Sequence, residues 1–145
     1  MGFADAYPPL HSAEHLLTAV LGRRFPEIRE YNSRLKSRKC VFEFHYDGTL
    51  TAADLAEVER EVKAIIAADE ATEIRTVARE AASSLPNLHQ VPQGAETVRV
   101  VRLGDADQRA CIGRHVARTG EIVNFRITTL RQAQPGLWRI NFSVD

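Results

Sequence analysis

Residues 8–24, PPLHSAEHLLTAVLGRR, predict an amphipathic helix that carries two histidines on one side. Two prolines are tolerated in a first helical turn, and Gly22 marks the expected end. His11 and His15 are four residues apart, so their Cβ atoms are about 5–6 Å apart on one helix face and can share a metal ion. Apolar residues recur at the helical spacing: Ala13, Leu16, Leu17, Val20 and Leu21.

A second pair with the same spacing, Cys111 and His115, lies near the other end of the chain. Either pair alone is a weak sign of a metal site, because histidines are common at ordinary helix positions. Together the pairs use three of the five histidines and one of the two cysteines. Three imidazole nitrogens and one thiolate form a tetrahedral set that zinc accepts. We therefore predict a Zn²⁺ site at His11, His15, Cys111 and His115, structural or catalytic.

The composition is that of a soluble globular protein. The chain has 145 residues, of which 44% are hydrophobic and 26% charged, and its formal net charge is zero. No apolar run approaches the roughly 20 residues that cross a bilayer, and the first residues lack the basic start of a signal peptide. We expect a cytoplasmic protein without a membrane partner. Cys40 is then expected in the core rather than in a disulfide.

The rest of the chain predicts an α+β fold in a single domain over residues 1–145. Thr51 is a plausible N-cap for a helix over residues 52–68, with Asp54 as the acid of a capping box. The expected strands are residues 40–46, 72–78 and 96–105, then two or three strands in residues 114–144, with a hairpin turn at Pro135-Gly136. Residues 79–84 suggest a short helix and residues 84–94 a loop. This order favours a largely antiparallel sheet packed with two main helices.

Three segments resemble a known family: HSAEHLL, VRVVRLGD and RACIGRHVARTGEIVNFRI. They are similar to the zinc-containing editing domain of alanyl- and threonyl-tRNA synthetases, and most similar to the free-standing AlaX-type trans-editing proteins. The family pattern is HxxxH, then CxxxH inside a run such as CGGTHV-x-x-TGEIG-x-F-x-I. Here that run begins at Cys111 and continues through Thr119-Gly120-Glu121-Ile122 to Phe125 and Ile127. The similarity covers essentially the whole chain, more weakly between residues 23 and 95.

The resemblance implies an aminoacyl-tRNA deacylase that acts in trans. Such a protein hydrolyses the ester between a wrong amino acid and the terminal ribose of tRNA: Ser or Gly on an alanine tRNA, or Ser on a threonine tRNA. The resemblance assigns the zinc ligands to His11, His15, Cys111 and His115. An aminoacyl ester is already activated, so a positioned water and help for the developing oxyanion are the main requirements.

Two positions depart from the family pattern. Ile112-Gly113-Arg114 stands where the family has Gly-Gly-Thr. Ile112 adds bulk, and Arg114 adds a charge that either holds a phosphate or ribose or forms an ion pair. These changes keep two alternatives open: a zinc hydrolase of the same fold that acts on another small ester or amide, and a non-catalytic zinc-containing module that binds a ligand or partner.

Three further side chains are candidates for the chemistry. Glu14, between the first two histidines, is either a general base or a solvent-facing helix residue. His45, on the strand CVFEFHYDG, and His89, in the loop SLPNLHQVP, are candidates for proton transfer near the ester; the alternative for His45 is a strand end in water. With Arg114, Glu14 and His45 form our predicted catalytic set.

The segment from Arg23 to Lys39 is basic and carries Phe25 and Tyr31. It suits attraction to a nucleic-acid backbone and stacking on the single-stranded acceptor end of tRNA, and its alternative is a solvated loop. The predicted contact residues are Arg23, Arg24, Arg34, Lys36, Arg38 and Lys39. We expect no DNA partner. Monomer and homodimer both stay open.

Overall fold

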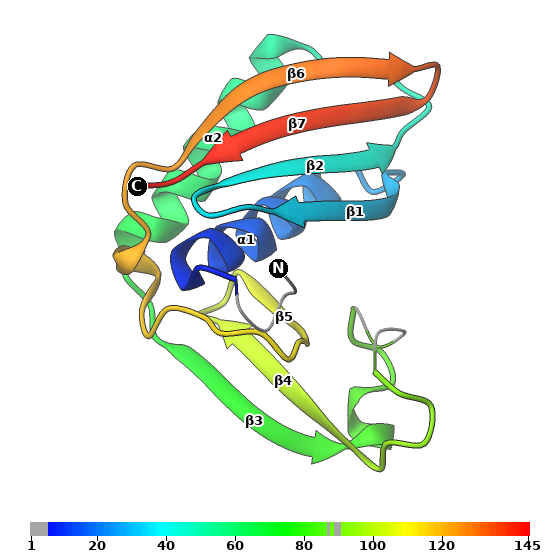
Figure 1. Cartoon of the computed structure of the whole chain (residues 1–145), viewed down its shortest axis with the longest axis vertical. Helices are drawn as coiled ribbons and strands as arrows, with labels where there is room; N and C mark the ends of the chain where they lie inside the picture. The colour runs from blue at the N-terminus through cyan, green and yellow to red at the C-terminus, as the bar shows by residue number, and fades with distance from the viewer. Residues whose placement is uncertain (1–5, 87, 89–90) are drawn as a thin grey trace.

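A computed structural model describes residues 6–86, 88 and 91–145 of the chain. Helix α1 (Pro8–Arg24) lies between two antiparallel sheets, and helix α2 (Ala52–Ala68) packs against α1 (Figure 1). The four-stranded sheet has the order β1 (Arg29–Leu35), β2 (Lys39–His45), β7 (Leu137–Ser143), β6 (Arg126–Gln134). The three-stranded sheet has the order β3 (Thr72–Ala78), β4 (Thr97–Leu103), β5 (Asp107–Ala110). The predicted α+β class is confirmed, with the strands divided between two sheets.

Helix α1 is buried on more than its apolar stripe. Its core residues Leu10, Ala13, Leu16, Leu17, Val20 and Leu21 are fully buried. The polar residues His11, Ser12, Glu14 and His15 are buried as well. Burying a polar group costs free energy unless the group has a hydrogen-bond partner or an opposite charge nearby. The residues around the first two turns of this helix are therefore expected to supply such partners.

The predicted helix over residues 8–24 is confirmed, but Gly22 is not the residue that ends it. The helix continues to Arg24, and the Phe25 N–H donates to the Leu21 carbonyl over 2.8 Å. Gly22 is not among the residues with positive φ, so it does not adopt the left-handed conformation of a glycine helix stop.

Helix α2 begins as predicted. The Asp54 N–H donates to Thr51 Oγ1 over 3.1 Å, and the Thr51 N–H donates to Asp54 Oδ2 over 2.9 Å, which completes a capping box. Leu55, Val58 and Val62 are buried on the inner face of the helix. This cap and this apolar stripe are the local signals that identify the helix in the sequence.

The four-stranded sheet contains one strand that we did not predict. β1 pairs antiparallel with β2 within the basic segment Arg23–Lys39, for which we predicted no strand and kept a solvated loop as the alternative to a nucleic-acid contact. Its side chains are mostly exposed, so the alternation of apolar and polar residues that reveals β2 is absent from β1. The predicted hairpin at Pro135-Gly136 is present between β6 and β7, with Gly136 at φ 78°.

The three-stranded sheet also contains an unpredicted strand, β5. It follows β4 after a tight turn in which Gly104 has a φ of 54°, and it has only four residues, too few for a clear periodic pattern. The short helix expected over residues 79–84 is a 3₁₀-helix, Arg79–Ala82. Across the described residues, no helix combines the length and apolar character that crossing a membrane requires.

Candidate metal centre and its cavity

The fold brings the two sequence pairs to one place. His11 and His15 come from α1, and Cys111 and His115 come from the loop that follows β5. We call these four residues the His/Cys cluster. Each offers one ligand atom, and the four atoms lie within 4.8 Å of one another. Cys111 Sγ is 3.5 Å from Nε2 of both His11 and His115. The cluster could hold a metal ion.

The surroundings of the cluster fit zinc. Ser12 Oγ is 2.9 Å from His115 Nδ1, and Asp107 Oδ2 is 3.3 Å from His15 Nδ1. Partners at Nδ1 leave Nε2 of each ring available to the centre of the cluster, which is the arrangement found around metal-bound histidines. Three imidazoles and one thiolate also match the donor preference of zinc.

The charge states of Cys111 and His115 favour metal binding. Burial opposes ionisation of Cys111, but hydrogen bonds from His11, His115 and His15 outweigh burial and lower the pKa of this thiol to about 3. Burial lowers the pKa of His115 to about 4. At neutral pH Cys111 is therefore a thiolate and His115 is neutral, and both are the forms that bind a metal. Burial alone would lower the pKa of His15, but hydrogen bonds to Asp107 and Cys111 raise it, so a metal ion must displace a proton from this ring.

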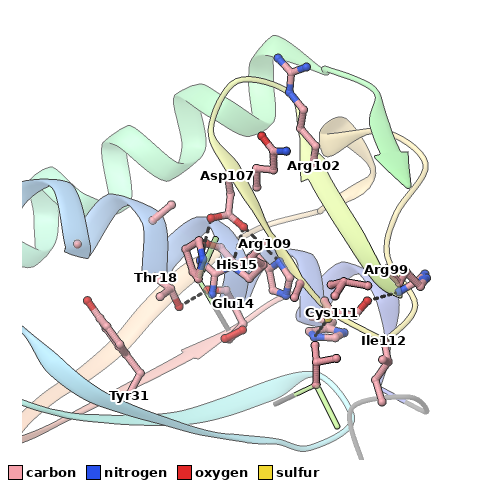
Figure 2. Close-up of a pocket in the computed structure, with 18 of the residues that line it drawn as sticks. Glu14, His15, Thr18, Tyr31, Arg99, Arg102, Asp107, Arg109, Cys111 and Ile112 are labelled. Atoms are coloured by element: carbon pink, nitrogen blue, oxygen red, sulfur yellow. Dashed lines mark hydrogen bonds and ion pairs between the residues drawn. The ribbon is translucent and has the colours of Figure 1, made fainter. Parts of the chain in front are cut away.

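Asp107 and Arg109 form a buried ion pair behind His15. Arg109 Nε and Nη2 donate to the two carboxylate oxygens of Asp107, each over 2.8 Å, and both side chains are less than a tenth exposed. Burial alone would raise the pKa of Asp107, but hydrogen bonds from His15 and Arg109 lower it instead. Asp107 thus holds the His15 ring from one side while Arg109 fixes the carboxylate from the other (Figure 2).

Arg99 on β4 holds the loop that carries Cys111. Its Nη1 donates to the carbonyls of Cys111 over 2.7 Å and Gly113 over 2.9 Å. Between these two carbonyls, Ile112 is 73% exposed. Ser12, Asp107, Arg109 and Arg99 are residues that sequence reasoning missed. Ser12, Asp107 and Arg99 contact residues far away in the chain, so no local spacing could have found these contacts. Arg109 follows its partner Asp107 by two residues, a spacing that is not specific to any site.

A cavity of about 1130 Å³ opens beside the cluster. It lies between α1, β1 and the β4–β5 hairpin, and His11, His15 and Cys111 form part of its wall. Tyr31 and Ser33 line it from β1, and the side chain of Tyr31 is drawn in Figure 2. The site is therefore a large cavity with potential metal ligands in one wall. A purely structural metal centre would instead be closed and would lie away from any cavity.

Glu14 lines this cavity and is 7% exposed. The solvent-facing alternative for Glu14 is therefore wrong: the helix turns this carboxyl group inward, next to the histidines. Ser33 Oγ donates to Glu14 Oε2 over 3.3 Å from the opposite strand. Glu14 is thus a polar contact between α1 and β1 at the cavity wall.

The other two predicted catalytic residues lie away from this wall. His45, at the end of β2, is half exposed, and its Nε2 is 3.2 Å from Glu30 Oε2. Arg114 is exposed on the loop between Cys111 and His115. Neither is among the described residues that line the cavity. His89 lies outside the described residues.

The six predicted nucleic-acid contacts do not form one surface. Arg23 and Arg24, at the C-terminal end of α1, are 3.6 and 3.5 Å from the Glu61 carboxylate. Arg38 stacks over Tyr7, just before the N-terminal end of the same helix. A helix of 17 residues is about 25 Å long, so these basic groups lie far apart. Arg34 is 3.8 Å from Glu43. Lys36 and Lys39 are exposed near Arg38 in the β1–β2 hairpin.

Comparison with known proteins shows which proteins this chain resembles. Residues 98–141 match the model of the threonyl and alanyl tRNA synthetase second additional domain. The alanine–tRNA ligase of Idiomarina loihiensis is 35% identical over 132 residues, and that of Mycoplasma pneumoniae is 33% identical over 134 residues. Each match covers 90% of this chain and 15% of the ligase. The resemblance predicted from the sequence is thereby confirmed at the level of this domain, and the chain spans about 15% of the length of the curated relatives it matches.

Proposed function

We propose that this chain, which matches the second additional domain of threonyl and alanyl tRNA synthetases, is a zinc-dependent deacylase of mischarged tRNA. The substrates we propose are Ser- or Gly-tRNA(Ala), and also Ser-tRNA(Thr). Residues 1–145 would act as one editing domain on tRNA supplied in trans, in the cytoplasm. The observation that carries the proposal is the His/Cys cluster in the wall of a cavity of about 1130 Å³.

The reaction needs little from the protein beyond placement. The oxygen of a water attacks the ester carbonyl, the bond from the carbonyl carbon to the ribose oxygen breaks, and a free amino acid and a ribose hydroxyl leave. A zinc ion held by His11, His15, Cys111 and His115 would supply Lewis acidity at this wall. The chain itself holds the aminoacyl end in the cavity, where exclusion of bulk water strengthens each polar contact.

The cavity has the size for the end of an aminoacyl-tRNA. It exceeds the usual volume of a small-molecule pocket, which is about 300–1000 Å³. A cavity of this volume has room for a terminal adenosine together with its amino acid. Arg23 lies in the cavity wall, and Lys36, Arg38 and Lys39 lie in the β1–β2 hairpin. We propose that these two separate groups, Arg23 at one end of α1 and the hairpin cations near the other end, both attract the acceptor strand, with an affinity that decreases as salt increases.

A second candidate, hydrolysis of another small ester or amide, is favoured by one observation. Ile112 lines the cavity and is 73% exposed, so its side chain takes up space at the wall where a glycine would leave room. Arg114, two residues on, is exposed and does not line the cavity. Ile112 would alter which acyl group is accepted without changing the cluster.

The test is a deacylation panel. Ser-, Gly- and Ala-charged alanine tRNA and Ser- and Thr-charged threonine tRNA are each incubated with the wild type and with His11→Ala. We expect release from at least one mischarged tRNA, no release from its correctly charged counterpart, and loss of release in His11→Ala. If zinc-loaded protein releases no amino acid from any of the five charged tRNAs, the proposal is wrong and the second candidate takes its place.

A further inference from the structure

The cavity wall contains a buried carboxylate, Glu14, that has no ion-pair partner among the residues the structure describes. Glu14 is 7% exposed, and none of the ion pairs among the described residues includes it. The hydrogen bond that it accepts from Ser33 comes from a neutral hydroxyl group. A buried charge is costly unless it is paired, so the site favours a ligand that brings a cation.

Two of the arginines that line the cavity are already engaged. Arg109 feels the charge of Glu14, but its guanidinium donates two hydrogen bonds to Asp107. Arg23, which also lines the cavity, is directed to the Ala106 carbonyl over 2.9 Å and to Glu61. Neither arginine is therefore available to Glu14.

The position of Glu14 relative to the cluster fits one part of the proposed substrate. Glu14 follows His11 by three residues and precedes His15 on the same buried turn of α1. An ester carbonyl placed at the cluster has its α-amino group on the adjacent carbon. A carboxylate beside the histidines is therefore within reach of that amino group, whatever the side chain of the amino acid.

We propose that Glu14, supported by Ser33, binds the α-ammonium group of the aminoacyl ester and makes a free amino group a requirement of the site. This inference rests on the proposed function. It assigns to Glu14 the recognition of a substrate cation in place of the general-base role considered from the sequence. It also predicts that acyl groups without a free amine, such as N-acetylated or hydroxy-acyl esters, are poor ligands.

The experiment measures binding, so it does not depend on turnover. Zinc-loaded wild type is titrated calorimetrically with 3′-(L-seryl)amido-3′-deoxyadenosine, whose amide bond resists hydrolysis. The matched probe has a hydroxyl group in place of the α-amino group. We expect the amine to bind about tenfold or more tightly than the hydroxyl probe, because a hydrogen bond to a charged group contributes at least that factor.

Glu14→Gln separates this role from the others, since the amide keeps the shape of the side chain and removes its charge. We expect this variant to bind both probes about equally. Glu57→Gln, an exposed change on α2, serves as the matched control and should keep the wild-type preference. Zinc content is measured for each protein.

Four results would overturn the inference. The first is that the wild type binds both probes equally, and the second is that it binds neither probe. The third is that Glu14→Gln keeps the preference for the amine, and the fourth is that Glu14→Gln weakens the binding of both probes alike because zinc is lost. The third result would assign the amine to the metal. The deacylation panel is read separately: release of amino acid without amine selectivity leaves the proposed function standing, and amine-selective binding without release leaves Glu14 as a ligand contact in a non-hydrolytic site.

Discussion

The two halves of the His/Cys cluster reach the same point by different means. His11 and His15 are placed by the geometry of α1, whose buried turns bring both rings to one side. Cys111 and His115 lie in a loop outside regular structure, where Arg99 holds the backbone and Ser12 contacts the ring of His115. The helical half is determined by local sequence, whereas the loop half depends on contacts from distant parts of the chain. The loop should therefore be the easier half to loosen.

The largest effect is expected when the loop loses its ligand. Cys111→Ser removes the thiolate, and the protein should retain no zinc after dialysis, as should His15→Ala on the helical side. Zinc per chain is measured by plasma mass spectrometry. Cys40→Ala is the matched control, because Cys40 is 1% exposed in the core and its loss should leave zinc content unchanged. Full zinc content in Cys111→Ser would exclude Cys111 as a ligand.

The two cysteines should also differ in their pH dependence. In the metal-free folded protein the pKa of Cys111 is lowered to about 3 from a reference of 9.0, so the thiolate persists as pH decreases from 8 to 5. Alkylation of Cys111 by iodoacetamide should stay nearly constant over this range, whereas in the denatured chain it should decrease about 1000-fold. Burial raises the pKa of Cys40, which should stay unreactive at both pH values. An equal decrease in folded and denatured protein would contradict the thiolate assignment.

Asp107 tests the support of the helical half. Asp107→Asn keeps the shape of the side chain but removes the charge that holds His15 and neutralises Arg109. Zinc affinity should decrease by about 10- to 100-fold, as is usual for loss of a carboxylate partner of a metal-bound histidine. Competition titration with a chelator gives the Kd. Asp105→Asn, an exposed change two residues away, should match the wild type; the same Kd in Asp107→Asn would show that His15 needs no such support.

Arg99 tests the loop half by itself, with the smallest expected effect. Arg99→Met keeps the long aliphatic stem and removes the donors to the Cys111 and Gly113 carbonyls. Zinc should dissociate about 3- to 10-fold faster, because the loop loses hydrogen bonds while the helix is untouched. Arg102→Met is the control, because Arg102 lies on the same strand but donates its hydrogen bond to the Gly104 carbonyl. Equal dissociation rates in both variants would show that the loop is held without Arg99.

The contrast between local sequence and distant contacts also explains which helices and strands could be predicted. Helix α2 has a capping box at Thr51 and an apolar stripe, and β2 alternates, so both are visible in the sequence. β1 is a strand only because it pairs with β2, and β5 is too short for a pattern. Propensity and period describe a segment by itself, and these two strands depend on their neighbours.

For the site, spacing alone predicted the four members of the cluster. It could not predict Asp107, which meets His15 across 92 positions of the chain, or Ser12, which meets His115 across 103. Nor could it decide whether Glu14 faces water, because that depends on β1 covering this side of α1. The chemistry of a motif is local, whereas the partners that tune it are set by the fold.

The most direct test of the central claim is X-ray absorption at the zinc edge of the purified protein. The claim is that a helix and a distant loop bind one ion. It predicts one sulfur at about 2.3 Å and imidazole nitrogens at about 2.0–2.1 Å in the first coordination shell. Bound zinc without a sulfur neighbour, or a protein that takes up no zinc at all, would contradict the account.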